Sequence, residues 1–256
     1  MSLLRLENIT QRFGGLIALD SISLPVARGG ITAIIGPNGA GKTTLFNVIS
    51  GFRAPMQGRV LFADEDITGL PAQEIARRGL VRTFQLVQLF ESLTVLENVK
   101  VGRHLHTSEG LANALWPFRS RAVEAQVDAA ARDLLKQVGL EAQAEAMATA
   151  LPYGQKRLLE IARALAAEPK LLLLDEPAAG LNRGETTRLG ELIRSIAGRN
   201  VTVLLIEHDM SFVMNIADRI AVLDFGKLIA EGTPAEIQTN KDVIAAYLGT
   251  MEAARA

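Results

Sequence analysis

The sequence contains no cysteine among its 256 residues. This absence excludes a disulfide scaffold, catalysis by a thiolate and a cysteine-ligated zinc site. Aromatic residues are scarce, with one tryptophan and two tyrosines. No charge of one sign dominates either, because 27 basic side chains face 28 acidic ones and leave a formal net charge of −1. A general basic field that could gather nucleic acid is therefore missing, and we expect no nucleic-acid partner.

Long hydrophobic runs are also missing. A helix that crosses a bilayer needs roughly 20 continuous apolar residues, whereas the longest apolar runs here, 171–174 and 203–206, have the length of buried strands. The opening residues MSLLRLENIT lack the cationic stretch, apolar block and cleavage site of a secretion signal. We therefore expect neither a secretion signal nor a membrane span.

Short apolar runs alternate with stretches of helical spacing along most of the chain. The pattern predicts a β-rich first 30 residues, then strands at Ile31–Ile35, Val60–Ala63, Leu171–Leu174, 201–206, 219–223 and 227–231. It predicts helices at Lys42–Ile49, Pro71–Arg78, Ala122–Val138, 154–167, 184–197 and 210–217, and two short ones that begin near Pro234 and Asp242. Apolar strands that alternate with helices indicate an α/β fold with a mostly parallel sheet and helices on both faces.

The segment between the two halves of this pattern has a different composition. Residues 95–150 are rich in Ala, Glu, Gln, Leu and Arg. We predict one domain over 1–256, in which an α-helical subdomain at 86–159 is inserted into an α/β core formed by 1–85 and 160–256. Within that insert, we expect Trp116 to serve packing, and we expect no metal at His104 and His106 because no third ligand stands nearby.

A glycine-rich loop follows the first buried strand. Residues 36–44 read Gly36, Pro37, Asn38, Gly39, Ala40, Gly41, Lys42, Thr43, Thr44, which matches the phosphate-binding pattern Gly-x4-Gly-Lys-Ser/Thr between a strand and a helix. The glycines let the backbone curl, and its N–H groups then point at phosphate together with the helix N-terminus. Lys42 adds a charge at the β/γ oxygens, and the Thr43 hydroxyl can reach Mg²⁺. This loop predicts the P-loop NTPase class, with a RecA-like sheet.

Two carboxylates follow the apolar run at 171–174. They stand at the carboxyl end of a predicted inner strand, the sheet edge at which ligands bind in open parallel sheets. Asp175 is predicted to hold Mg²⁺, and Glu176 to orient or deprotonate a water near the γ-phosphate.

Two polar residues are predicted at the same edge. Gln85 follows a probable edge strand that begins at Val81, and its amide can bridge metal, water and protein without adding charge. His208 follows the predicted strand 201–206, where its imidazole could donate to the γ-phosphate and bridge to Glu176. We therefore list Thr43, Gln85 and Asp175 as Mg²⁺ ligands and Gln85, Glu176 and His208 as catalytic residues.

In order and spacing these elements resemble an ABC-transporter ATPase subunit over essentially the whole chain. The resemblance adds a signature at Leu151, Pro152, Tyr153, Gly154 and Gln155 and a D-loop at 179–182 that ends in Asn182. Finer motifs resemble the ATPase subunits of branched-chain amino acid (Liv-type) importers, and the larger of their two subunits in particular; these motifs are Arg12–Leu16, Leu45–Asn47, Thr83–Gln85, Leu93–Val99, Tyr153–Gln155, Ile206–Met210, Gly232–Pro234 and Ala246–Gly249.

The resemblance implies an ATPase with ATP and Mg²⁺ as cofactors, coupled to import of leucine, isoleucine and valine. A second ATPase subunit, identical or related, would close head to tail on the first, so that each signature meets the partner's ATP. Phe13 matches the aromatic residue that stacks on adenine. Two transmembrane permease subunits would contact the surface around Gln85 and residues 86–99, a substrate-binding protein would act indirectly, and the chain would lie peripherally on the cytoplasmic face of the cell membrane.

The sequence departs from the usual pattern in three places. Pro152 replaces a serine of the signature, Tyr153 replaces a glycine, and Asn182 stands where aspartate is commoner in the D-loop. One hydroxyl donor is therefore absent from the signature, although the N–H groups of Gly154 and Gln155 at a helix start still offer an anion site.

Other functions remain open at this point. A closely similar subunit could serve urea, short amides or other amino acids, because cargo contacts lie in other chains. A non-transport ABC ATPase is disfavoured by the single cassette and the missing basic surface, and a nucleotide-sensing scaffold by the presence of Lys42 and Glu176. Two basic clusters, one of Arg77, Arg78 and Arg82 and one of Lys156 and Arg157, are expected to be solvated helix faces.

Overall fold

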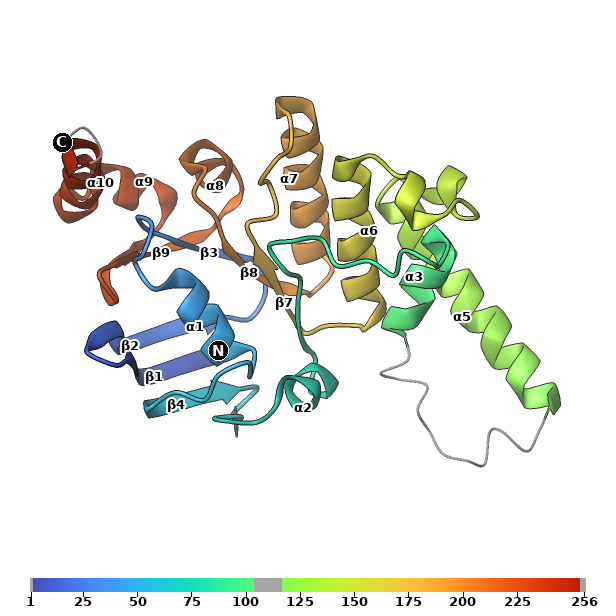
Figure 1. Cartoon of the computed structure of the whole chain (residues 1–256), viewed down its shortest axis with the longest axis horizontal. Helices are drawn as coiled ribbons and strands as arrows, with labels where there is room; N and C mark the ends of the chain where they lie inside the picture. Colours follow the sequence, from blue (N-terminus) through green and yellow to red (C-terminus); the bar gives the residue numbers. More distant parts are fainter. Residues whose placement is uncertain (1, 104–116, 254–256) are drawn as a thin grey trace.

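The computed structural model describes residues 2–103 and 117–253 (Figure 1). The expectations for His104, His106 and Trp116 lie outside the described residues. The strands are β1 Ser2–Phe13, β2 Leu16–Ala27, β3 Ile31–Ile35, β4 Gln57–Phe62, β5 Glu65–Asp66, β6 Leu80–Arg82, β7 Leu171–Asp175, β8 Thr202–Ile206, β9 Arg219–Asp224 and β10 Lys227–Gly232. The helices are α1 Lys42–Ile49, α2 Ala72–Arg77, α3 Val95–Gly102, α5 Pro117–Gln137, α6 Tyr153–Ala166, α7 Arg183–Ala197, α8 Met210–Ile216, α9 Pro234–Thr239 and α10 Lys241–Ala253, with short 3₁₀ turns at Glu141–Gln143 and Ala148–Ala150.

The larger sheet has the strand order β10-β9-β3-β8-β7-β6. All neighbours in it pair in parallel except β10, which pairs antiparallel with β9. Strands β3, β7 and β8 are buried along their whole length, as expected for apolar runs that are covered on both faces. The prediction that the strand before Gln85 lies at a sheet edge is confirmed by the position of β6.

The β-rich N-terminal part forms a second sheet, which is antiparallel and has the order β2-β1-β4-β5. Helix α1 packs with both sheets, and its Leu45 and Phe46 are fully buried in the core that they share. Helices α6, α7, α8 and α9 pack against the opposite face of the larger sheet. The predicted α/β class with helices on both faces is confirmed, and the antiparallel sheet completes one of those faces.

The predicted insert forms a helical unit at one end of the molecule, away from α9 and α10 (Figure 1). Helices α3, α5 and α6 share a core of their own, with Val99, Leu135 and Leu159 fully buried. Helix α6 also packs Ile161 and Leu165 against the larger sheet. It therefore belongs to both units, and the boundary between residues 159 and 160 stays a prediction.

The strand register brings several loops to one edge of the larger sheet. Ile206 at the end of β8 pairs with Ile34 of β3 and with Asp175 of β7. The carboxyl ends of these three strands are therefore level, so the loops that follow them meet at the edge where parallel sheets bind ligands.

Candidate functional site

The glycine-rich loop joins β3 to α1, as predicted. Gly36 and Gly41 have positive φ angles of 152° and 102°. A Cβ at Gly36 would lie 2.1 Å from the carbonyl oxygen of Leu223, and one at Gly41 would lie 2.5 Å from that of Ala18. Because a side chain at either position would collide with backbone, glycine is required for the loop to pack against its neighbouring strands.

Lys42 begins α1 and its side chain is buried. The Nζ atom donates to the carbonyl oxygens of Gly36 at 2.7 Å and Pro37 at 2.9 Å. Burial lowers the pKa of Lys42, and the nearby charge of Glu176 partly opposes that effect. The ammonium is thus held at the loop by two neutral acceptors, and an anion bound there would add a directly bonded, negatively charged partner.

Glu176 follows β7 in the left-handed region, with a φ of 45°, and its N–H donates to the carbonyl oxygen of Ile206 at 3.0 Å. Gln85 Nε2 donates to Glu176 Oε2 at 2.9 Å, and His208 Nδ1 lies 3.8 Å from the same oxygen. The structure thus brings Gln85 and His208 to the carboxylate of Glu176. The three predicted catalytic residues come from three separate strand ends. A strained backbone at such a point is typical of functional sites.

A cavity of about 330 Å³ lies over the glycine-rich loop. It is lined by residues 38–44, by Glu176, and by Phe13, Leu16, Ile17, Ala18 and Phe225. The polar groups stand at the loop, and the apolar ones come from β1, β2 and the turn between β9 and β10. The cavity therefore has a polar end suited to phosphate and an apolar end suited to a planar base.

Phe225 also lines this cavity, and the sequence did not predict it. It is 82% exposed and has a φ of 40°. Its turn is fixed by Gly226, whose N–H donates to Ala40 at 3.1 Å and whose carbonyl oxygen accepts from Asp20 at 2.8 Å. A strained, exposed aromatic residue held against the loop adds a second aromatic side chain to Phe13. The sequence signal was an aromatic residue before glycine in a strand-to-strand turn.

Asp175 is buried and forms an ion pair with Arg82, Nη2 to Oδ2, at 2.7 Å. The other terminal nitrogen of Arg82 donates to Asn47 Oδ1 on α1 at 2.8 Å and to Oγ of Ser50, the C-cap of α1, at 2.9 Å. The expectation that Arg82 belongs to a solvated basic face is therefore wrong. Arg77, by contrast, is exposed and pairs with Glu74 on α2.

The expectation that Arg157 lies on a solvated helix face is also wrong. Its side chain is 1% exposed and pairs with Glu160 on the same helix at 3.1 Å. Solvated helix faces were expected because the sequence shows charge but not the acceptors that surround it. Arg82 finds acceptors in segments far away along the chain, and Arg157 finds them both in Glu160 of its own helix and in the distant carbonyls of Phe84 and Gln85.

The signature begins α6, with Pro152 at its N-cap and no side-chain cap bond. A Cβ at Gly180 of the D-loop would lie 3.1 Å from the Tyr153 ring, and one at Gly154 would lie 2.5 Å from the carboxylate of Glu185. Asn182 caps α7, since its side chain accepts from the Glu185 N–H at 3.0 Å. Leu151, Gly154 and Gln155 are not among the residues that line the phosphate-loop cavity.

Glu207 is a second residue that the sequence reasoning missed. It is completely buried; Oε1 accepts from the Ala178 N–H at 2.8 Å, and Oε2 accepts from those of His208 at 3.1 Å and Asp209 at 3.5 Å. Burial raises the pKa of Glu207, and the three N–H donors oppose this. One carboxylate therefore joins the loop after Glu176 to the loop that carries His208. A charged residue directly after an apolar strand was the available signal.

We expect Glu207→Ala to lower the free energy of unfolding by about 2–4 kcal/mol, because buried N–H groups on two loops lose their acceptor. Urea unfolding followed by circular dichroism measures this loss. The matched control is Glu191→Ala on the exposed face of α7, for which the change should stay within about 0.5 kcal/mol. Equal stabilities of the two variants would contradict the bridging role of Glu207.

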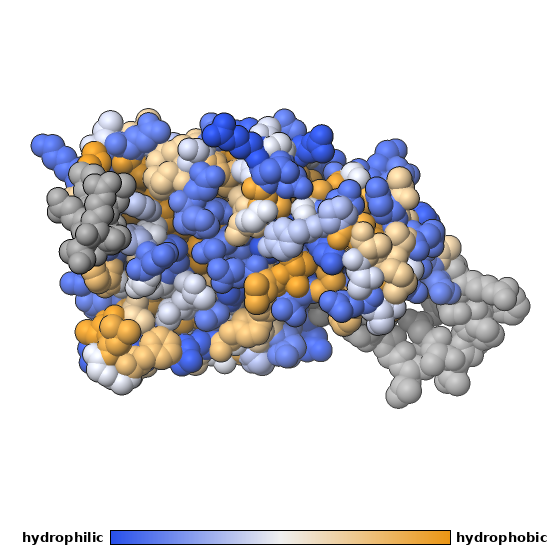
Figure 2. All heavy atoms as spheres, turned by 45° about the horizontal axis from the view of Figure 1, so that its top comes forward, coloured by the Kyte–Doolittle hydropathy of each residue, from blue (hydrophilic) through white to orange (hydrophobic). Residues whose placement is uncertain are grey.

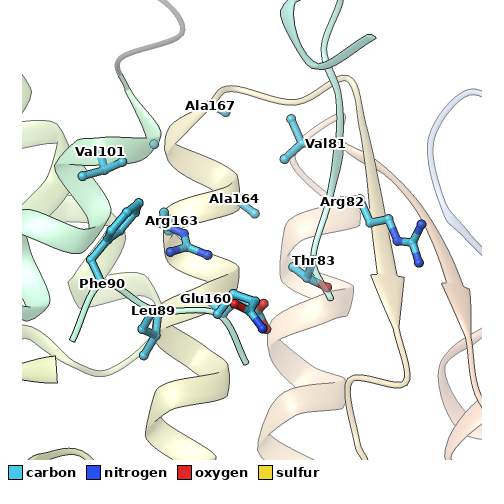
Figure 3. Close-up of a pocket in the computed structure, with 12 residues that line it drawn as sticks. Val81, Arg82, Thr83, Leu89, Phe90, Val101, Glu160, Arg163, Ala164 and Ala167 are labelled. Carbon is cyan, nitrogen blue, oxygen red and sulfur yellow. The ribbon is translucent and has the colours of Figure 1, made fainter. Parts of the chain in front are cut away.

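A second hollow, of about 360 Å³, lies between β6, the segment after it, α3 and α6. Figure 3 shows Phe90 and Leu89 from the segment after β6 facing Arg163 and Glu160 on α6, with Val101 of α3 above them. The Arg163 guanidinium lies 5.5 Å from the centre of the Phe90 ring. This β6–α6 groove adjoins Gln85 in sequence but is separate from the phosphate-loop cavity.

Comparison with known proteins gives consistent matches. Residues 19–179 match the family model described as ABC transporter, and residues 227–253 match the one described as branched-chain amino acid ATP-binding cassette transporter. The chain is 48% identical over 250 residues to the high-affinity branched-chain amino acid transport ATP-binding protein LivG of Escherichia coli K12, covering 96% of this chain and 98% of that protein.

Two solved structures extend the comparison. The ADP conformation of an ATP-binding cassette of an ABC transporter superposes with a TM-score of 0.84 at 36% identity, covering 97% of this chain and 99% of the other. A dimeric post-hydrolysis state of an ATP-binding cassette, bound to ADP and phosphate, gives a TM-score of 0.75 at 26% identity, covering 90% of this chain and 98% of the other.

Proposed function

The chain belongs to the ATP-binding subunits of the ABC transporter family, and from this premise we propose that it binds ATP in the phosphate-loop cavity to drive import of branched-chain amino acids. As a member of that family it is an ATPase whose hydrolysis is coupled to transport. The observation that carries the site assignment is that Glu176, held by Gln85, lines the same cavity as Lys42 and Thr43.

The cavity suggests how the nucleotide lies. The triphosphate of the bound nucleotide would contact the backbone N–H groups of the loop and the Lys42 ammonium, where the positive end of α1 also favours negative charge. Its base would lie at the apolar end, against Phe13 and Phe225. The Arg53 guanidinium lies 4.6 Å from the centre of the Phe13 ring, so the base would use the opposite ring face.

The residues predicted to hold Mg²⁺ carry donors of the kind that ion takes, but among them only Thr43 lines the phosphate-loop cavity, and Asp175 is buried in its ion pair with Arg82. Thr43, Gln85 and Asp175 offer hydroxyl, amide and carboxylate oxygens, the donors that Mg²⁺ prefers. Within residues 2–103 and 117–253, no three His, Cys, Asp or Glu side chains gather into a metal cluster. An ion that protein groups and substrate phosphates bind jointly suits this sparse set. Bound there, Mg²⁺ would offset charge on the phosphates.

Hydrolysis transfers the γ-phosphoryl group to water. In the proposed mechanism Glu176 accepts the proton of the attacking water, as a general base. Gln85 holds the carboxylate through Oε2, which leaves Oε1 for the water. His208 is exposed beside it and would donate to the γ-phosphate, while Lys42 stabilises the charge that develops there.

We propose that the signature acts on a second ATPase subunit. Its residues begin α6 beside the D-loop of their own chain and are absent from the lining of their own cavity, so they are available to a partner. The related cassette solved as a dimer supports this arrangement. A head-to-tail dimer of identical or related subunits would close each cavity with the partner's Gly154 and Gln155 N–H groups.

The permease partners are proposed to contact the β6–α6 groove and its rim. Leu86 is 74% exposed and Phe90 47%, and both belong to the segment between Gln85 and α3. On the face drawn in Figure 2, hydrophobic residues form separate patches among hydrophilic ones. No helix in the described ranges is both long and apolar enough to cross a bilayer. We propose that the chain lies peripherally on the cytoplasmic side of the membrane through such partners, with a substrate-binding protein acting indirectly.

Labelled leucine uptake tests the cargo. In the native cell, a chromosomal Glu176→Gln change should reduce uptake about 100-fold if the base is required for each transport cycle. The matched control is Glu124→Gln, an exposed glutamate on α5, which should leave uptake unchanged. Immunoblotting must show normal levels of the permease subunits. Unchanged leucine uptake with Glu176→Gln would contradict the cargo, and urea and short amides would then be tested.

A further inference from the structure

Arg157 is a charged residue in a place where charge is costly. It lies one turn after the start of α6, and its side chain is 1% exposed. Its two terminal nitrogens donate to consecutive carbonyl oxygens of the Gln85 loop, Nη1 to Phe84 at 2.8 Å and Nη2 to Gln85 at 2.7 Å. These are short, charge-assisted bonds to a segment more than 70 residues earlier in the chain.

Glu160 completes the attachment. It pairs with Arg157 at 3.1 Å, and its other oxygen accepts from the Phe84 N–H at 3.3 Å. The N–H and the carbonyl of Phe84 are therefore both bound by side chains of α6. We call Arg157 and Glu160 the α6 clamp.

The same guanidinium also contacts the main chain of Glu176 and the side chain of the signature residue Tyr153. Arg157 Nη2 donates to the main-chain carbonyl of Glu176 at 3.4 Å and to the Tyr153 hydroxyl at 3.3 Å. Gln85, whose main-chain carbonyl accepts from Arg157, donates through its side chain to the Glu176 side chain at 2.9 Å. One side chain thus contacts the signature residue, the Gln85 loop and the residue predicted to be the base.

We propose that Arg157 is a positioning residue that couples the signature helix α6 to Gln85 and Glu176 of the same chain. A displacement of α6, such as engagement of the signature by a partner subunit would produce, moves the amide that holds the catalytic carboxylate. The proposal rests on the proposed role of Glu176 as base. Arginine suits the task because its planar fork reaches several acceptors at once, which a lysine ammonium cannot do in the same geometry.

Stability alone does not account for the clamp. Replacing a buried ion pair by apolar side chains of similar size is often neutral or stabilising, because desolvation offsets the attraction between the charges. A clamp that bonds main-chain groups of two functional loops fixes their positions relative to α6. Substitution of Arg157 should remove this fixed placement of the two loops relative to α6.

The test compares Arg157→Met with the wild-type full-length chain. We expect ATP affinity, measured by calorimetry, to stay within about 2-fold, while kcat falls about 10- to 100-fold through misplacement of the reacting groups. Hydrogen exchange of residues 84–90, followed by mass spectrometry, should become faster. Arg157→Lys, which keeps the charge but not the fork, should recover part of kcat. Where Arg157→Met does not fold, this lysine variant and Glu160→Gln carry the comparison.

The matched control is Arg188→Met, an exposed arginine on α7 that lies outside the α6 clamp and lines neither cavity. It should leave kcat and the exchange of residues 84–90 near their wild-type values. Wild-type kcat in Arg157→Met, an equal loss in Arg188→Met, or a loss of ATP affinity in step with kcat would each overturn the proposal.

The proposed base is tested separately from the clamp. In a Glu176→Gln background, Arg157→Met should cause far less than its own loss of kcat, because both residues act on one step. Full additivity would overturn the coupling and leave the base in place. Normal hydrolysis in Glu176→Gln alone would remove the base, whereas faster exchange of residues 84–90 in Arg157→Met would still report the clamp.

Discussion

Glu176→Gln is expected to bind ATP with normal affinity and to hydrolyse it about 100- to 1,000-fold more slowly, the usual scale for loss of a general base. The substitution keeps the shape of the side chain, and its amide oxygen can still accept the bond from Gln85. It removes the basic carboxylate oxygen that takes the proton of water. Since a negative charge near the phosphates is also lost, affinity for ATP should be equal or slightly higher.

Steady-state hydrolysis and calorimetric titration of the purified chain measure the two quantities separately. Glu124→Gln on α5 is the matched control, because it makes the same chemical change at an exposed position outside the site. Near-normal hydrolysis by Glu176→Gln would contradict the assignment of the base. A large loss of ATP affinity would instead mean that this carboxylate helps to hold the nucleotide.

The parts of the fold that the sequence predicted well are those set by local patterns. The runs at Ile31–Ile35 and Leu171–Leu174 are inner strands because nearly all of their side chains are apolar and are buried from water. The glycine-rich loop falls between a strand and a helix as its pattern requires. Polar residues directly after such strands meet at one edge, which is why the sequence predicts that Glu176 and His208 lie together.

The sequence did not predict which charged residues are buried. Arg82 and Arg157 look like parts of basic surface clusters, yet both are buried because they find acceptors in distant segments, Asp175 for Arg82 and the carbonyls of Phe84 and Gln85 for Arg157. Glu207 receives its donors from a loop after β7 as well as from its own. Phe225 reaches the phosphate-loop cavity only because β9 lies beside β3. Each of these facts depends on tertiary neighbours, which local spacing does not encode.

The role of Lys42 can be separated from its effect on folding. Its buried ammonium has two carbonyl acceptors, and burial lowers its pKa. Because of the desolvation cost, this buried charge does not raise the free energy of unfolding of the nucleotide-free chain. An apolar side chain of similar length should fill the same space without the desolvation cost.

We therefore expect Lys42→Met to keep or raise the melting temperature of the nucleotide-free chain while ATP affinity falls at least about 100-fold, through loss of charge-assisted bonds to phosphate. Lys42→Ala should lose affinity to the same extent but should also be destabilised, because it leaves a small cavity. At an ATP concentration 100 times its Kd, the wild-type chain gains about 2.7 kcal/mol of stability from binding. Both variants should lose most of that gain.

Thermal unfolding with and without Mg-ATP, together with calorimetry, measures these effects. The matched control is Lys136→Met near the end of α5, an exposed lysine for which the ATP-dependent shift should equal that of the wild type. Unchanged ATP affinity in Lys42→Met would contradict the phosphate-loop site itself. A lower melting temperature without nucleotide, together with normal affinity, would mean that Lys42 serves the loop and not the ligand. Because burial penalises the ammonium until phosphate arrives, the expected combination of a stable empty protein and lost binding identifies Lys42 as a residue retained for its ligand.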